Sequence, residues 1–107
     1  MTTSDKESWT VRAKFRLKKT EDGGRKTGII SGYWPNHVFE YKDNEIVNMW
    51  MGVVTFDGQE AINPGEEKIV KVLFSPGPYV KKFLTVGRTW WIYEGPNLIG
   101  EAQILEV

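Results

Sequence analysis

Residues Trp9–Leu17 read WTVRAKFRL, with apolar side chains at every odd position and polar side chains at every even position. Successive side chains of a β-strand point to opposite faces, so this pattern predicts a strand with one face on a core and one in water. The even positions carry Arg12, Lys14 and Arg16, and Lys18 follows in phase. Residues 9–17 are therefore expected to form a half-buried strand whose outer face is basic.

The rest of the chain is a series of short apolar runs separated by Gly, Pro, Asn and Asp, with no long segment of helical period. Six or seven strands spaced in this way are typical of an all-β sandwich or barrel, and a closed barrel leaves no exposed strand edge. We expect residues 1–8 to form a flexible tail and residues 9–107 to form one barrel domain. The expected strand segments are residues 28–36, 38–41, 45–56, 68–74, 83–94 and 98–107.

The amino-acid composition excludes several classes of function for this chain. The chain has 107 residues, no Cys and one His, and its 14 Lys and Arg balance 14 Asp and Glu. The absence of Cys excludes disulfides, thiolate metal sites and cysteine nucleophiles, and it fits a reducing, cytoplasmic location. No apolar run is long enough for a membrane span, so we expect no membrane partner. With a single His, neither a metal site nor a cofactor is expected.

Enzyme motifs are absent as well. The chain contains no phosphate-binding GxxxxGK[ST] run, no HExxH and no nucleophile elbow, so we expect no nucleoside triphosphate and no catalytic residues. Glu66 and Glu67 are adjacent and would point to opposite sides of a strand. His37 has no orienting partner in the sequence and is interpreted as a structural or surface residue. These features predict a binding protein rather than an enzyme.

The neutral total hides a local excess of positive charge. Residues 12–26 hold seven basic and two acidic side chains, an excess of five that the remaining residues offset. Arg12, Lys14, Arg16 and Lys18, here called the basic stripe, repeat at about 7 Å along one strand face, which is close to the phosphate spacing of a nucleic acid. The alternative is that these side chains only keep an edge strand soluble.

Aromatic residues offer a second kind of surface. Tyr33, Trp34 and Pro35 fall in a turn, where Trp34 is expected to be exposed, and one of the adjacent Trp90 and Trp91 must face outward. An exposed Trp can anchor a protein interface, stack on a base, or pack over a barrel end. The interface residues predicted on this basis are Tyr33, Trp34, Asn36 and Trp50.

Residues 23–36, 63–66 and 87–107 together resemble the third, C-terminal domain of elongation factor Tu. Residues 23–27 (GGRKT), followed by residues 31–36 (SGYWPN), are similar to the GGRHT and GYRPQ motifs that open this barrel. Residues 63–66 (NPGE) resemble its turn before a strand. Residues 87–107 (GRTWWIYEGPNLIGEAQILEV) align without gaps to its ending. The resemblance implies a six-stranded Greek-key antiparallel barrel without the GTPase domain of the full-length factor.

The resemblance also implies candidate contacts with a tRNA stem. Arg25 and Lys26 match the Arg and His of the family's GGRH motif, and Asn36 stands where the family has Gln. Gly95 matches a glycine close to the tRNA. In contrast, Trp34 and Asn97 replace Arg residues, and Pro96 replaces a glycine.

Two functions follow as expectations. The first is a module that docks on a protein partner, favoured because the tRNA-facing positions are the ones that differ. The partner can be a translation component, a toxin or a second copy of the chain. The alternative is an RNA-binding module that uses the basic stripe together with Arg25, Lys26, Asn36 and Gly95 on the backbone of a tRNA stem or another structured RNA.

Overall fold

The alternating segment forms strand β1 (Trp9–Leu17), and its burial follows the sequence pattern. Val11, Ala13, Phe15 and Leu17 are buried, whereas the polar side chains between them are exposed. Trp9 at the start of the strand is half-buried and packs against the core. The strand predicted from the sequence is therefore confirmed with both of its faces.

In the computed structural model, which describes residues 9–75 and 80–107, six strands close into an antiparallel barrel. The predicted tail, residues 1–8, lies outside the described residues. The other barrel strands are β2 (Asn36–Val38), β5 (Trp50–Thr55), β6 (Glu67–Phe74), β7 (Thr89–Glu94) and β8 (Asn97–Glu106). The connections contain a small hairpin, β3 (Tyr41–Lys42) with β4 (Glu45–Ile46), and the 3-10 helices η2 (Thr20–Asp22) and η3 (Val80–Phe83).

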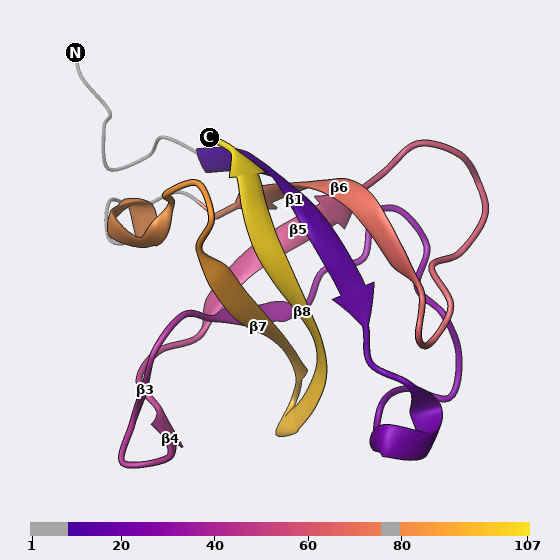
Figure 1. Cartoon of the computed structure of the whole chain (residues 1–107), viewed down its shortest axis with the longest axis horizontal. Helices are drawn as coiled ribbons and strands as arrows, with labels where there is room; N and C mark the ends of the chain where they lie inside the picture. Colours follow the sequence, from indigo (N-terminus) through magenta and orange to yellow (C-terminus); the bar gives the residue numbers. More distant parts are fainter. Residues whose placement is uncertain (1–8, 76–79) are drawn as a thin grey trace.

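The order of strands around the barrel is β1-β6-β5-β2-β7-β8, and β8 pairs with β1 to close it. Strands β2, β5 and β6 are consecutive barrel strands, and each is the neighbour of the next. Strand β1 joins this group beside β6, and strand β7 joins it beside β2. Each of the two four-stranded groups formed in this way is a Greek key. Figure 1 shows β1 and β8 side by side, although they come from opposite ends of the described chain. The expected fold class, a six-stranded Greek-key antiparallel barrel, is confirmed.

The barrel interior is filled by large side chains from every barrel strand and from the loops. Phe39 stacks on Trp90 at 5.2 Å and on Phe83 at 5.0 Å between ring centroids. Trp90 is fully buried and Trp91 is half-exposed, which confirms that one of the pair faces outward. No helix in the described part of the chain is both long and apolar enough to cross a membrane.

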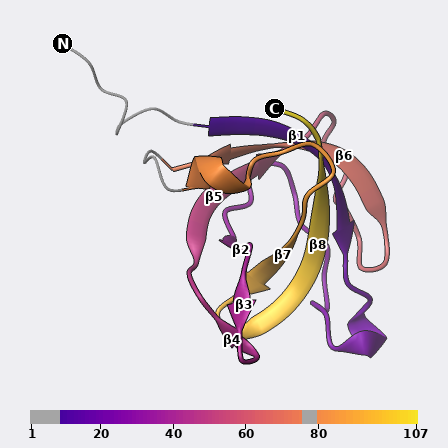
Figure 2. The ribbon, with the colours of Figure 1, turned by 60° about the vertical axis from the view of Figure 1, so that its left-hand side comes forward.

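Several expected strand segments are wrong. Residues 28–36 form only isolated bridges at Ile29 and Tyr33 before β2 begins, residues 38–41 are divided between β2 and β3, and residues 83–94 form a strand only from Thr89. Residues 45–56 were expected to form one strand, but the structure divides them into β4 and β5, separated by Val47, Asn48 and Met49. Asp43 and Asn44 adopt positive φ angles of 53° and 66°, which suit the tight turn of a two-residue hairpin. The chain thus turns back on itself and forms a hairpin that projects from one end of the barrel (Figure 2).

Candidate functional site

The basic stripe lies on the outer face of β1, as expected, but acidic side chains accompany it. Arg12 forms an exposed ion pair with Glu106 at 3.2 Å. Arg16 stands opposite Glu67 of β6 and Glu101 of β8 in the strand register. Because β1 has a strand on each side, it is not an edge strand, and the interpretation of these residues as protectors of an exposed edge is wrong.

The remaining members of the predicted RNA set lie in different places. Lys14 stands between the uncharged Ile69 and Gln103. Lys18 follows β1 and is half-buried, while Lys26 is exposed in the next loop. Gly95 occupies the turn between β7 and β8 with a φ of 57°, a conformation that glycine adopts at low cost.

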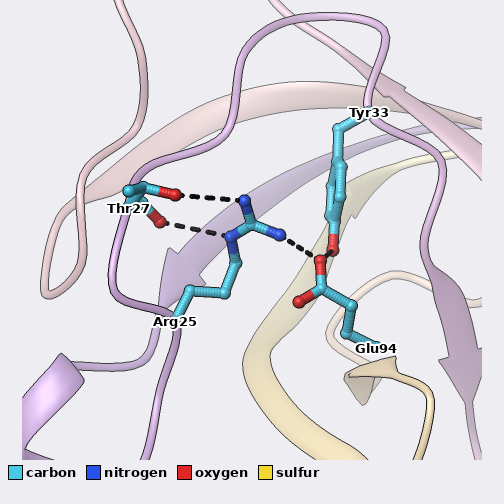
Figure 3. A network of polar contacts seen from close by, with 4 residues as sticks. All are labelled: Arg25, Thr27, Tyr33 and Glu94. Atoms are coloured by element: carbon cyan, nitrogen blue, oxygen red, sulfur yellow. Dashed lines mark hydrogen bonds and ion pairs between the residues drawn. The ribbon is translucent and has the colours of Figure 1, made fainter.

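Arg25 is held within the molecule by several partners (Figure 3). Its Nη1 donates to a carboxylate oxygen of Glu94, and its Nε donates to the Thr27 carbonyl at 3.2 Å. The Tyr33 hydroxyl donates to the same Glu94 oxygen, and the guanidinium lies 5.3 Å from the centre of the Tyr33 ring. We call Arg25, Thr27, Tyr33 and Glu94 the Arg25 network.

The Arg25 network connects segments that are distant in sequence. It joins the loop after η2 and the segment before β2 to the end of β7. Burial of the Tyr33 hydroxyl, together with its hydrogen bond to the Glu94 carboxylate, raises the pKa of Tyr33. These contacts occupy Arg25 and Tyr33, each of which was predicted to face a partner, so both act first as parts of the fold.

A patch of exposed apolar side chains lies on the outer face of β5 and β6. Val53 pairs with Leu73 across the two strands, and Met51 precedes Val53 by two residues on the same face. Met51 is 53% exposed and Leu73 is 41% exposed. Strand register places the segment before β2 next to them, because Tyr33 pairs with Val54 and Asn36 pairs with Met51.

Trp34 completes this surface. Counting inward from those two pairs, Trp34 stands opposite Val53, and its side chain is 60% exposed. The exposure expected for Trp34 is confirmed. We call Trp34, Met51, Val53 and Leu73 the apolar patch; Asn36 borders it. Contiguous apolar surface that contains Trp and Met is typical of protein interfaces.

The predicted interface residues therefore divide into two groups. Trp34 and Asn36 belong to the patch or its border, whereas Tyr33 and Trp50 pack against the core. The Trp50 ring lies edge-on to Phe83 at 6.2 Å between centroids. Met51, Val53 and Leu73 were not predicted, although their alternation with buried neighbours is visible in the sequence. Their shared position depends on the register between β5 and β6.

Of the structural and surface roles expected for His37, the structure shows the first, because the side chain is buried. Its Nδ1 accepts a hydrogen bond from the Trp90 indole at 2.9 Å, and its Nε2 donates to the Gly52 carbonyl at 3.0 Å. Burial lowers the pKa of His37 from 6.5 to about 4. The ring is completely buried, so it has no access to a substrate in solution.

Neither the arrangement of polar side chains nor the comparison with protein families identifies a further site. Within residues 9–75 and 80–107, no group of three or more His, Cys, Asp and Glu side chains is arranged to hold a metal ion. All buried side-chain nitrogen and oxygen atoms in the same ranges have hydrogen-bond partners. A comparison of the chain with protein-family models finds no family model that matches it.

Proposed function

We propose that this chain is a non-catalytic protein-interaction module, similar to the third-domain barrel of elongation factor Tu, that docks on a protein partner through the apolar patch. The observation that carries the proposal is the strand register, which sets the exposed Trp34 opposite the half-buried Val53 and pairs Val53 with the exposed Leu73. Apolar side chains on a closed barrel stay in water unless another molecule covers them. Nucleic-acid phosphates gain nothing from such a surface, whereas an apolar protein surface does.

The resemblance to elongation factor Tu supports only part of the proposal. The closed antiparallel barrel is the fold expected from it, and a translation-related protein partner is the extension we propose. The tRNA-stem function is the second candidate. It is favoured by the exposure of Arg12, Lys14 and Arg16 on one strand face. We rank it lower because Glu106, Glu101 and Glu67 neighbour that face and Arg25 is engaged within the Arg25 network.

Capture from a nuclease-treated lysate tests the proposed docking. The full chain is immobilised beside two single variants, Trp34→Ser in the patch and Val86→Ser as the matched control. Val86 is 65% exposed and lies outside the patch, in the loop before β7. We expect a protein that is retained by the native chain and by Val86→Ser, survives nuclease treatment and is depleted at least about tenfold by Trp34→Ser, the loss typical of a hot-spot residue.

Three outcomes would contradict docking of a different protein on the apolar patch. Loss of the retained protein on nuclease treatment would favour the RNA function. Equal depletion by Trp34→Ser and Val86→Ser would show that the apolar patch does not bind the protein. A native chain that is dimeric by light scattering and becomes monomeric with Trp34→Ser would show that a second copy covers the patch. The RNA function has its own test, because charge reversal of Arg12, Lys14 and Arg16 must then weaken tRNA binding and reduce its salt dependence.

A further inference from the structure

A hollow of about 330 Å³ lies on the barrel wall formed by β7, β8 and the end of β1. This volume falls in the range of small-ligand sites. Apolar side chains of the β7–β8 hairpin and basic side chains at the end of β1 line it together. Its lining residues are Arg16, Lys18, Lys19, Asp22, Trp91, Leu98, Gly100 and Glu101.

Part of the hollow is bare backbone. A Cβ atom on Gly100 would lie 2.7 Å from the Arg16 carbonyl oxygen, so only glycine allows β8 to approach β1 so closely. Gly100 pairs with the inward-facing Leu17 and Ile92, so a side chain there would point into the core, and only the Gly100 backbone lines the hollow. In the register, Trp91 pairs with Glu101 and Glu101 pairs with Arg16, which places the three side chains in one row on the outer face.

Trp91 is braced from outside the hollow. The Tyr41 ring lies edge-on to Trp91 at 5.1 Å between centroids, and the hydroxyls of Tyr41 and Tyr93 hydrogen-bond at 2.6 Å. The β3–β4 hairpin thus lies against β7 and limits the movement of the indole ring. A half-exposed Trp in a fixed position provides a surface on which a flat ring can stack without further ordering.

The charges of the hollow favour an anion at one end. Three basic residues, Arg16, Lys18 and Lys19, face two acidic ones, Asp22 and Glu101. Glu101 neighbours Arg16 in the register and offsets its charge, so Lys18, Lys19 and Asp22 together leave a net charge of plus one at the other end. The Lys18 ammonium lies 3.7 Å from the position of a Cβ on Gly23, beside the turn that follows η2.

We propose that this hollow binds a nucleotide unit, with the base stacked on Trp91 and the phosphate held by Lys18 and Lys19. A stacking surface next to a cluster of cations is the pattern by which proteins hold single-stranded nucleic acids. The unit can belong to single-stranded RNA or to a free nucleoside monophosphate. The site differs from the RNA-stem hypothesis because it reads one unpaired base, and it does not depend on the apolar patch, which lies on β5 and β6.

Fluorescence anisotropy of the full chain with a fluorescein-labelled octa-adenylate RNA tests the proposal. Reversing both lysines (Lys18→Glu with Lys19→Glu) should weaken binding by at least about tenfold, because two phosphate contacts become repulsive. The matched control is Lys81→Glu with Lys82→Glu, an equal change of charge on η3 outside the hollow. We expect this control to retain affinity within about twofold, since screening weakens distant charges.

Two further variants address stacking and charge separately. Trp91→Leu keeps an apolar side chain but removes the large aromatic face, and it should weaken binding by about fivefold or more. Glu101→Gln removes a negative charge from the hollow without changing its shape, and it should strengthen binding by about twofold. A purely structural role for these residues would not produce changes of opposite sign in two variants that remain folded by circular dichroism.

Competition identifies the source of the nucleotide. Displacement of the octamer by AMP would assign the site to a free nucleoside monophosphate, and binding that AMP does not displace would assign it to single-stranded RNA. The proposal is overturned if neither ligand binds, or if both lysine pairs reduce affinity equally. Trp34→Ser should leave octamer binding unchanged, so a failure here is distinguishable from a failure of the protein-docking proposal.

Discussion

At the scale of single residues, His37 is held in one protonation state by the chemistry of its neighbours. The Trp90 indole can only donate a hydrogen bond and the Gly52 carbonyl can only accept one. Nδ1 must therefore be unprotonated and Nε2 must carry the hydrogen. Phe74 packs edge-on to the ring at 5.0 Å, so no water layer is available to solvate an imidazolium. A proton added at Nδ1 would face another donor.

This arrangement makes stability depend on pH. The unfolded chain binds the His37 proton near pH 6.5, whereas the folded chain binds it only near pH 4. The free energy of unfolding should be fully retained above pH 6.5 and fall by about 3 kcal/mol as the pH decreases to 4. Urea unfolding at several pH values measures the slope. His37→Gln, which keeps a donor for Gly52, should lack this component; an identical slope in both proteins would refute it.

The Arg25 network allows a comparison between two ion pairs of different burial. The Arg25 side chain is 23% exposed and that of Arg12 is 49% exposed. Arg25→Met should lower the free energy of unfolding by about 1–2 kcal/mol, because it also leaves Glu94 and Tyr33 without a shared cation. The matched control, Arg12→Met, removes an exposed pair and should cost less than about 0.5 kcal/mol. Equal costs would show that the network adds no stability.

At the scale of elements, the contact between β8 and β1 depends on Gly100. A methyl group there would meet the Arg16 carbonyl oxygen at 2.7 Å, and backbone cannot move aside as a flexible side chain would. Gly100→Ala should therefore lower the free energy of unfolding by about 2 kcal/mol through strain in the closing strand pair. Thermal unfolding measures the loss. Glu101→Ala, an exposed change at the next position, should have little effect on the free energy of unfolding. A similar loss in this variant would show that any substitution in this part of β8 is destabilising, and that the close approach at Gly100 is not the cause.

The division of residues 45–56 shows where element prediction from sequence ends. Eight of the twelve residues in the run are apolar, so its composition favours one long strand. The break follows from the hairpin at Asp43 and Asn44, whose turn brings Glu45 opposite Lys42 and directs Val47 to the Glu40 carbonyl. The hairpin contains only two residue pairs, so it differs from one continuous strand by only a few backbone hydrogen bonds. Such a small difference is settled by tertiary packing, here by Tyr41 against Trp91.

At the scale of the whole molecule, the sequence predicts which faces are buried but not which strands are neighbours. The alternation in Trp9–Leu17 predicts the strand and its basic face, and the turn residues predict an all-β fold. Neither pattern reveals that Glu67, Glu101 and Glu106 neighbour the basic stripe. The apolar patch and the hollow beside Trp91 likewise arise where segments distant in sequence meet, and only the barrel topology brings their residues together.

The position of β1 between β6 and β8 has a consequence for the order of folding. Both partners of β1 follow it by about fifty residues or more, so the strand must wait with two unsatisfied hydrogen-bonding edges while the rest of the barrel assembles. During that interval the same strand of another molecule can pair with its free edges. Two such strands would bring Arg12, Lys14 and Arg16 against a second set of cations, and the repulsion opposes that association until β6 and β8 supply their carboxylates.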